Sequence, residues 1–212
     1  MTAANNKSKP FLTTRELAVL AVLTALCLIL ALYGSIPVGP LTITTGILPV
    51  AIAAFVFGPK GGAIEGGMFG LISFLQAVQI LPSKSALLVA LAQLNAPLTF
   101  IQCVITRLLC GFCAGCIAWL IGRRIRLQIG AGLTGFFTAF LNTCFFMPCL
   151  FLLFGHTENI EAIRNGRGIL VTMFGMITVN VICEWILTTI VASAVGTALV
   201  KAGMAGPGRR QN

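Results

Sequence analysis

The stretch Asn180-Val181-Ile182-Cys183-Glu184 lies inside the apolar run of residues 169–200, where no water is available to solvate a carboxylate. A charge near the centre of a bilayer costs about 3 kcal/mol or more, so an intramembrane glutamate is a candidate functional residue that needs a partner. Asn180 and Glu184 are four residues apart and would share one face of a helix.

The composition is that of an integral membrane protein. Hydrophobic residues make up 58% of the 212 residues and charged residues only 9%, which is too little polar surface for a soluble domain. The net charge of +9 does not indicate nucleic-acid binding, because the basic residues fall between apolar runs rather than in one patch. The 8 cysteines all lie within apolar runs, so they do not indicate an extracellular disulfide framework.

Six apolar runs are long enough to cross the lipid bilayer, and they predict an all-α membrane protein with a single domain, residues 1–212. Pro49 predicts a kink in the second run, because proline removes a helical hydrogen bond. Residues 34–40 predict a turn without charge, residues 58–61 a tight turn, and residues 81–97 a long loop or partly re-entrant segment. The predicted spans are residues 16–33, 41–57, 62–80, 98–122, 129–154 and 169–200.

The positions of lysine and arginine predict the orientation. With the amino terminus inside, the cytoplasmic segments carry ten basic residues, the outer loops carry three, and Arg107 remains within a span. This distribution agrees with the positive-inside rule, so both termini are expected in the cytoplasm. The inner residues are Lys7, Lys9, Arg15, Lys60, Arg123, Arg124, Arg126, Lys201, Arg209 and Arg210, and the outer ones are Lys84, Arg164 and Arg167.

Several polar side chains are expected at a similar depth in different spans. We interpret them as one substrate-binding pocket that opens outward, although Glu184 and Arg107 could instead pair only with each other while the asparagines link helices. Glu65 is expected near the cytoplasmic end beside Lys60, where it would snorkel or pair without a substrate role. The predicted pocket residues are Gln76, Arg107, Asn142, Asn180 and Glu184.

Small residues mark a possible docking face on the first span. Ala18, Ala21 and Ala25 form a stripe that suits either close packing inside the bundle or contact with another membrane subunit.

Other chemistry is disfavoured by what the sequence lacks. Cys110-x-x-Cys113-x-x-Cys116 has no second ligand pair and no nearby histidine, so we expect no metal site. The single histidine, His156, lies in an outer loop, which disfavours an intramembrane serine protease. No Gly-x-x-x-x-Gly-Lys-Ser/Thr loop occurs, so this chain is not expected to hydrolyse nucleotides. We expect no enzymatic activity and no cofactor, and any uphill transport would need energy from another subunit.

A series of short motifs resembles one family over essentially the whole chain. In their order and spacing, they are similar to the substrate-binding S components of energy-coupling factor (ECF) transporters, the bacterial vitamin importers. The pantothenate type is most similar, with a Pro-Arg, an Asn-Thr and an Asn-x-x-x-Glu in the last three helices, although Thr106 here replaces the proline. The motifs are Ile47-Leu48-Pro49-Val50, Phe57-Gly58-Pro59-Lys60-Gly61-Gly62, residues 66–74, Thr106-Arg107-Leu108-Leu109-Cys110-Gly111, Leu141-Asn142-Thr143, Asn180-Val181-Ile182-Cys183-Glu184 and Val200-Lys201-Ala202.

The resemblance implies a six-helix binding protein of the bacterial plasma membrane that captures a vitamin from outside. It also implies a transmembrane coupling subunit and two ATPase subunits as partners, with the Ala18, Ala21 and Ala25 stripe facing the coupling subunit. Pantothenate is the expected vitamin. Two alternatives remain: a pyridoxine or hydroxymethylpyrimidine compound bound by the same fold, or a stand-alone carrier in which Glu184 takes up a coupling proton.

Overall fold

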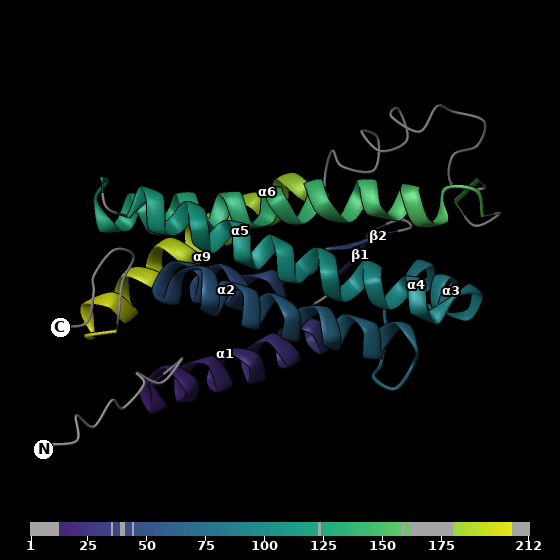
Figure 1. Ribbon diagram of the computed structural model, residues 1–212, viewed down its shortest axis with the longest axis horizontal. Helices are drawn as coiled ribbons and strands as arrows, with labels where there is room; N and C mark the ends of the chain where they lie inside the picture. The colour runs from purple at the N-terminus through teal and green to yellow at the C-terminus, as the bar shows by residue number, and fades with distance from the viewer. Residues whose placement is uncertain are drawn as a thin grey trace, which may run out of the picture.

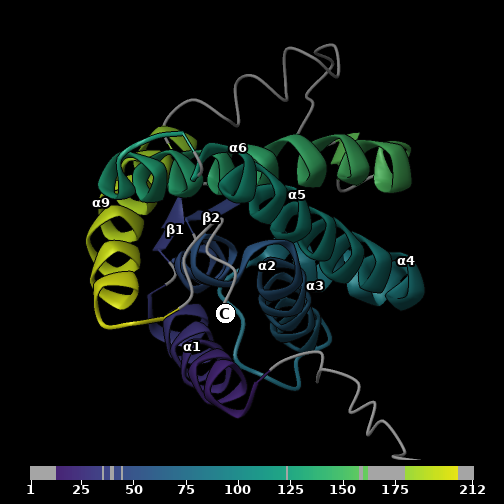
Figure 2. The same ribbon diagram turned by 60° about the vertical axis from the view of Figure 1, so that its left-hand side comes forward.

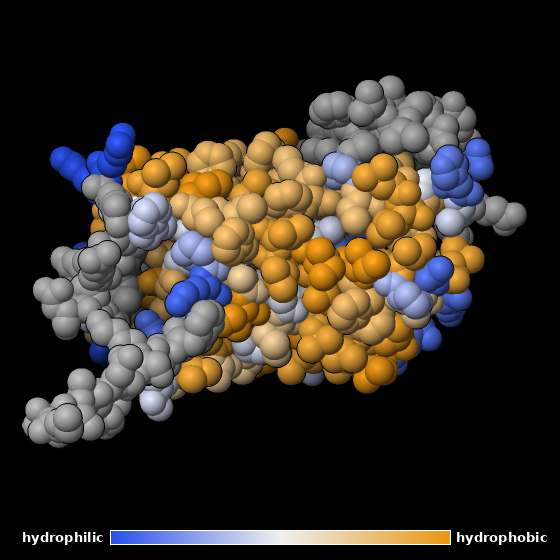
Figure 3. Space-filling view, viewed as in Figure 1, coloured by the Kyte–Doolittle hydropathy of each residue, from blue (hydrophilic) through white to orange (hydrophobic). Residues whose placement is uncertain are grey.

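Long helices lie side by side in the computed structural model, which describes residues 13–34, 36–38, 41–43, 45–122, 124–157, 160–161 and 180–204 (Figure 1). Exposed apolar side chains, among them Val22, Leu120 and Leu152, lie on the outside of the bundle. On the face shown in Figure 3 they form an apolar belt between two more hydrophilic ends. Five helical segments of the described chain are long and apolar enough to cross a membrane: Thr14–Tyr33, Ile47–Ala77, Ala96–Ile121, Leu127–Phe154 and Val181–Lys201.

Helix α1 (Thr14–Tyr33) begins at a capping box and lies beside the end of the last helix. Thr13 Oγ1 accepts from the Glu16 N–H at 3.3 Å, and Glu16 Oε2 accepts from the Thr13 N–H at 2.8 Å. The Arg15 guanidinium donates to the carbonyls of Ala202 (3.3 Å) and Gly203 (3.4 Å), just after helix α9 (Asn180–Lys201). The start of α1 and the end of α9 therefore lie at the same end of the bundle (Figure 1).

Two short strands follow α1, where the sequence predicted no strand. Strands β1 (Ile36–Val38) and β2 (Leu41–Ile43) pair antiparallel, with Ile36 opposite Ile43 and Val38 opposite Leu41. The prediction of a simple turn over residues 34–40 and of a helix beginning at residue 41 was therefore wrong. The β-branched isoleucine, valine and threonine residues here favour a strand, and paired strands satisfy the backbone groups of this segment.

Helix α2 (Ile47–Ala77) consists of two arms that fold back on each other at Gly58. Gly58 has φ 69° and ψ −152°, a conformation that glycine adopts without steric cost. Ile47 packs with Phe69 and Ile72 in one cluster, so the first arm runs antiparallel to the second, as Figure 2 shows. The turn predicted at residues 58–61 is thus present. The helical part of the first arm, residues 47–57, is only about 16 Å long, about half the thickness of the hydrocarbon core.

Pro49 does not kink α2. It occupies the first turn, where a backbone N–H has no helical acceptor, so its missing N–H costs nothing there. The only non-helical dihedrals inside α2 are those of Gly58. The kink predicted at Pro49 was wrong, because the helix begins six residues later than the predicted span.

The predicted loop of residues 81–97 contains a helix, α3 (Ala86–Leu94). Ser85 caps it by accepting from the Leu88 N–H at 3.4 Å, and its Leu87 and Leu91 pack against the end of α6. Asn95 then caps α4 (Ala96–Phe100), which continues through a π-helical turn, η1 (Ile101–Ile105), into α5 (Thr106–Ile121). Together α4, η1 and α5 form one continuous helical segment, Ala96–Ile121, that corresponds to the predicted fourth span.

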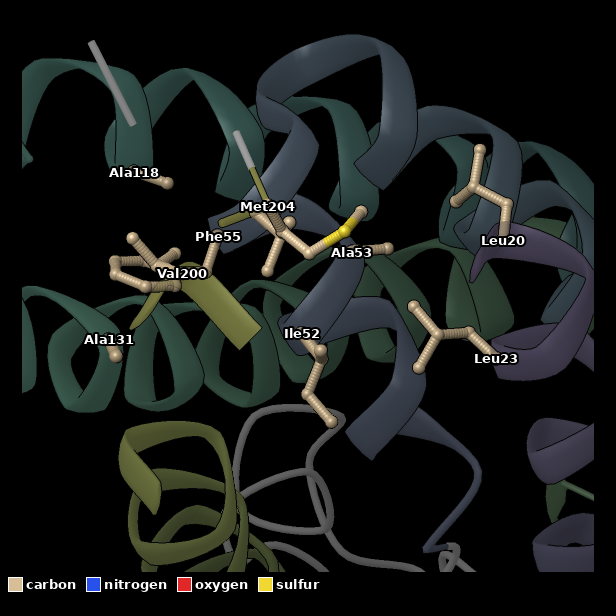
Figure 4. Packing of buried hydrophobic residues seen from close by; sticks show 10 residues of the cluster. Leu20, Leu23, Ile52, Ala53, Phe55, Ala118, Ala131, Val200 and Met204 are labelled. Atoms are coloured by element: carbon tan, nitrogen blue, oxygen red, sulfur yellow. The ribbon is translucent and has the colours of Figure 1, made fainter. Parts of the chain in front are cut away.

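Helices α6 (Leu127–Phe154) and α9 complete the bundle, and residues 162–179, which include the start of the predicted sixth span, lie outside the described residues. Most of the core lies between the helices that pack on the first arm of α2. There Ile52, Ala53 and Phe55 contact residues of α1, α5, α6 and α9 (Figure 4). The cluster contains Leu20, Leu23, Ile52, Ala53, Phe55, Val56, Ala118, Ala131, Val200 and Met204.

Candidate functional site

Arg107 is a buried cation in the first turn of α5. Its side chain is 5% exposed, and its guanidinium lies 4.6 Å from the ring centre of Phe69 on α2 and 5.0 Å from that of Phe146 on α6. One of its terminal nitrogens donates to the carbonyl of Cys103 at 3.2 Å. The buried Nε has no acceptor within the described residues. Arg107 is therefore held between two aromatic faces with hydrogen-bonding capacity left over.

Gln102 lies beside Arg107, and the sequence interpretation did not include it. It belongs to the π-helical turn η1 and is 0% exposed. Its Nε2 donates to the carbonyl of Phe146 at 2.8 Å, while its Oε1 is buried and has no donor within the described chain. A glutamine near the outer end of an apolar run carries no sequence signal that distinguishes it from a surface residue.

Residue positions along helix α6 show how the groups on the neighbouring helices α5 and α9 compare in depth within the bundle. On the α5 side, the Cys110 thiol donates to the carbonyl of Thr138 at 3.2 Å, and Gln102 binds Phe146. The two helices are antiparallel, so the same register brings Arg107 level with residue 141. Arg107 therefore lies near the midpoint of α6, which runs from residue 127 to residue 154.

Glu184 lies at nearly the same level on the other side of α6. Gly135 of α6 lies directly against the backbone of Thr188 of α9, since a Cβ added to Gly135 would be only 2.5 Å from the Thr188 carbonyl oxygen. This contact sets the register between the two helices. Continued by one turn, this register brings Glu184 level with residue 139, close to the level of Arg107. Glu184 is 9% exposed.

Arg107 and Glu184 lie at nearly the same level along α6, on two helices that both pack against it. The sequence predicts that the Arg107 guanidinium and the Glu184 carboxylate meet in one pocket. Their common level along α6 permits such a contact, and the meeting of the two groups stays a prediction.

Asn142 adds an acceptor at this level. It is half-buried on α6, one turn before Phe146, and its Oδ1 is buried with no donor in the described part of the chain. We call Gln102, Arg107, Asn142 and Glu184 the central polar site. A buried cation, two amide acceptors and a carboxylate next to aromatic rings suit a small polar ligand with an anionic group. Across the described ranges, no group of three or more His, Cys, Asp or Glu side chains could hold a metal ion.

Residues 15–196 match the protein family described as "ECF transporter, substrate-specific component". The chain belongs to this family. It is therefore an S component, a transporter subunit of the bacterial plasma membrane that crosses the bilayer several times.

Two curated relatives of this S component cover nearly its whole length. The "Pantothenic acid transporter PanT" of Lactococcus lactis subsp. cremoris is 25% identical over 196 residues, which cover 88% of this chain and 94% of the relative. The "Pantothenate transporter PanT" of Leuconostoc mesenteroides subsp. mesenteroides is 28% identical over 207 residues, which cover 93% of this chain and 95% of the relative.

Gln76 is not brought to the central polar site of the S component. Its Nε2 donates to the carbonyls of Ala31 (3.2 Å) and Pro82 (3.0 Å). It lies seven residues beyond Phe69, about 10 Å farther along the second arm of α2. Gln76 thus joins the end of α1 to the segment that follows α2.

Asn180 is the first described residue of α9, but its side chain lies outside the described residues. The expectation that Glu65 snorkels to the cytoplasmic end was wrong. Its side chain is 0% exposed, and its Oε2 accepts a hydrogen bond from Thr24 Oγ1 of α1 at 3.0 Å. Glu65 therefore joins α1 to α2 inside the bundle.

The predicted docking residues Ala18, Ala21 and Ala25 are all exposed on α1. The buried residues of this helix lie on its other side and are Leu20, Leu23, Cys27 and Ala31. The alanine stripe is therefore not used for packing within the described chain.

Proposed function

We propose that this S component binds pantothenate and serves its uptake. The observation that carries this proposal is the burial of Arg107 between two aromatic rings with an unused N–H. A buried guanidinium needs an anionic partner, and pantothenate has a carboxylate. The printed names of both relatives, which cover almost the full chain, support the same ligand.

Each end of pantothenate has a partner of suitable chemistry. Arg107 binds the carboxylate, because a guanidinium presents a planar fork of donors that matches two carboxylate oxygens. Asn142 and Asn180 bind the amide and hydroxyl groups, and Glu184 accepts from a hydroxyl. Asn180 is included because it precedes Glu184 by four residues in the sequence, a spacing that predicts one shared helix face.

A ligand panel tests this assignment. The purified protein in detergent is heated with each of several water-soluble vitamins, because a ligand that binds only the folded state raises the apparent stability. We expect pantothenate to raise Tm more than pyridoxine, hydroxymethylpyrimidine, thiamine or riboflavin does. If an uncharged or cationic compound raises Tm more than pantothenate does, that compound is the ligand. Arg107 would then serve as the counter-charge of Glu184.

We further propose that residues 1–212 form one membrane domain with six spans and both termini in the cytoplasm. The two arms of α2 would count as the second and third spans. Support comes from the basic residues at the end of the bundle where α1 starts and α9 ends (Figure 1): Arg15, Lys60, Arg124, Arg126 and Lys201. Cysteines introduced near residues 124 and 84 should react with a membrane-impermeant reagent from the inside and the outside, respectively.

In this proposal the energy for uptake comes from partners. A transmembrane coupling subunit docks on the exposed stripe Ala18, Ala21 and Ala25, and two ATPases drive the complex. Reconstituted alone in liposomes, the protein should bind pantothenate but take up little of it, with or without a pH gradient. Uptake by the isolated protein driven by a pH gradient would instead indicate a proton-coupled carrier.

A further inference from the structure

Gln102 carries a buried acceptor without a donor, close to Arg107, the residue proposed to bind the carboxylate. The side chain is fully buried, and its Oε1 lacks a donor within the described residues. Burying an acceptor without a donor is unfavourable, so such a group in a native structure needs a reason. Neither Arg107 nor Asn142 donates to it in the structure.

The orientation of the Gln102 amide follows from its neighbour. The atom 2.8 Å from the Phe146 oxygen must be the NH₂ group, because a backbone carbonyl accepts hydrogen bonds but cannot donate one. The other amide atom is therefore an oxygen, which only accepts. A ligand group that meets it must carry an N–H or O–H.

The π-helical turn and Phe146 place Gln102 close to Arg107. Gln102 and Arg107 are five residues apart, which in a regular α-helix would separate their faces, but π-helical i to i+5 bonding brings them closer to one side. Phe146 contacts both residues: its carbonyl binds Gln102, and its ring lies 5.0 Å from the Arg107 guanidinium.

We propose that Gln102 determines ligand specificity by accepting a hydrogen bond from the amide N–H of pantothenate. This inference rests on the proposed function and adds a residue to that same site. The amide is the donor nearest to the carboxylate in pantothenate, only two methylene groups away, so it is the ligand donor nearest to Gln102 when Arg107 holds the carboxylate. The site thereby discriminates against a ligand that has an oxygen in place of this N–H, because that oxygen and Gln102 Oε1 would be two buried acceptors without a donor between them.

The test combines one variant with one analogue. Gln102→Met keeps the side-chain length and removes the acceptor, and the ester analogue of pantothenate replaces the amide N–H by oxygen. Wild-type protein should bind the ester at least tenfold more weakly than pantothenate by isothermal titration calorimetry. Gln102→Met should bind pantothenate at least tenfold more weakly than wild type but should bind the ester about as well as wild type does. Gln93→Met, at an exposed position on α3, is the matched control and should leave both affinities within twofold.

Each other outcome overturns the inference. If wild type binds the ester as tightly as pantothenate, no protein acceptor forms a hydrogen bond with the amide N–H. This result does not depend on whether any variant folds. If Gln102→Met binds pantothenate within twofold of wild type, or loses affinity equally for both ligands, Gln102 is only structural. If wild type binds neither compound, the pantothenate site itself is wrong, and the inference falls with it.

Discussion

At the scale of single residues, Arg107 should be the main determinant of affinity. We expect Arg107→Ala to weaken pantothenate binding at least tenfold. A hydrogen bond to a charged group contributes about 1.5–3 kcal/mol, and about 1.4 kcal/mol corresponds to a tenfold change in Kd. Arg107→Lys keeps the charge but loses the planar fork, so it should fall between wild type and alanine. Titration calorimetry measures all three, and an alanine variant within twofold of wild type would refute the assignment.

The Thr24–Glu65 hydrogen bond should affect stability and not binding. Thr24→Val removes the donor from a fully buried carboxyl group, so we expect a loss of about 1–3 kcal/mol in the free energy of unfolding. Thr24→Ser retains a hydroxyl and should lose less. Thermal unfolding in detergent measures the effect, and pantothenate affinity should stay within twofold. A valine variant as stable as wild type would mean that Glu65 has another donor.

The burial of Arg107 and Glu184 could be predicted from the sequence, whereas that of Gln102 and Glu65 could not. Arg107 and Glu184 stand out because a charge in an apolar run is costly unless it has a partner. Gln102 is buried through a π-helical turn that no sequence pattern indicates. Glu65 lies near a turn, which suggested solvent access, but it faces α1 and is fully buried. Burial depends on which neighbour covers a face, and that is a tertiary property.

At the scale of elements, the second arm of α2 and α5 approach each other through glycines. A Cβ on Gly66 would overlap the carbonyl oxygen of Arg107, and one on Gly70 would lie 2.6 Å from that of Cys103. A Cβ on Gly67 would only touch the Leu108 side chain at 3.7 Å. The close contact thus depends on one face of the helix, and it fixes the backbone position of Arg107.

We therefore expect Gly66→Ala to reduce both stability and ligand binding. Overpacking of this kind costs about 1–3 kcal/mol, and moving α5 away shifts Arg107 relative to the site. Gly67→Ala adds the same methyl group one residue along and should be neutral or slightly stabilising, because alanine is the better helix former. Thermal unfolding and pantothenate titration on both variants check this. Equal effects at the two positions would contradict the packing argument.

The first and fifth spans were predicted well because helices that cross the bilayer need a long apolar run, whereas the short first arm of α2 and the segments between the helices were not. The predicted ends 16–33 and 129–154 differ by only two residues or fewer from α1 and α6. The β1–β2 hairpin and α3 were missed because short segments lack a periodic signal, and their conformation depends on pairing and on capping by Ser85. Gly58 was found because glycine followed by proline marks a turn.

At the scale of the whole molecule, the proposed ligand site and the proposed docking stripe lie in different parts of the bundle. The central polar site lies around α5, α6 and α9, whereas α1 lies apart from α5 and α6 (Figure 2) and carries the exposed residues Ala18, Ala21 and Ala25. We expect Ala21→Trp to abolish co-purification with the coupling subunit and to leave pantothenate affinity within twofold. Leu152→Trp adds an aromatic side chain to an exposed position of α6 and should affect neither. If the Ala21→Trp variant co-purifies with the coupling subunit as well as wild type does, the stripe Ala18, Ala21 and Ala25 is not the docking face.

The contacts of Arg15 with the carbonyls of Ala202 and Gly203 have a practical consequence for the order of the chain. Because α1 starts where α9 ends, a few glycine and serine residues could join residue 204 to residue 13. New ends could then be opened in the short basic turn between α5 and α6, which lies at the same end of the bundle. Such a circular permutant would keep every helix in its present orientation and would carry fused reporter domains on α6 instead of on α1.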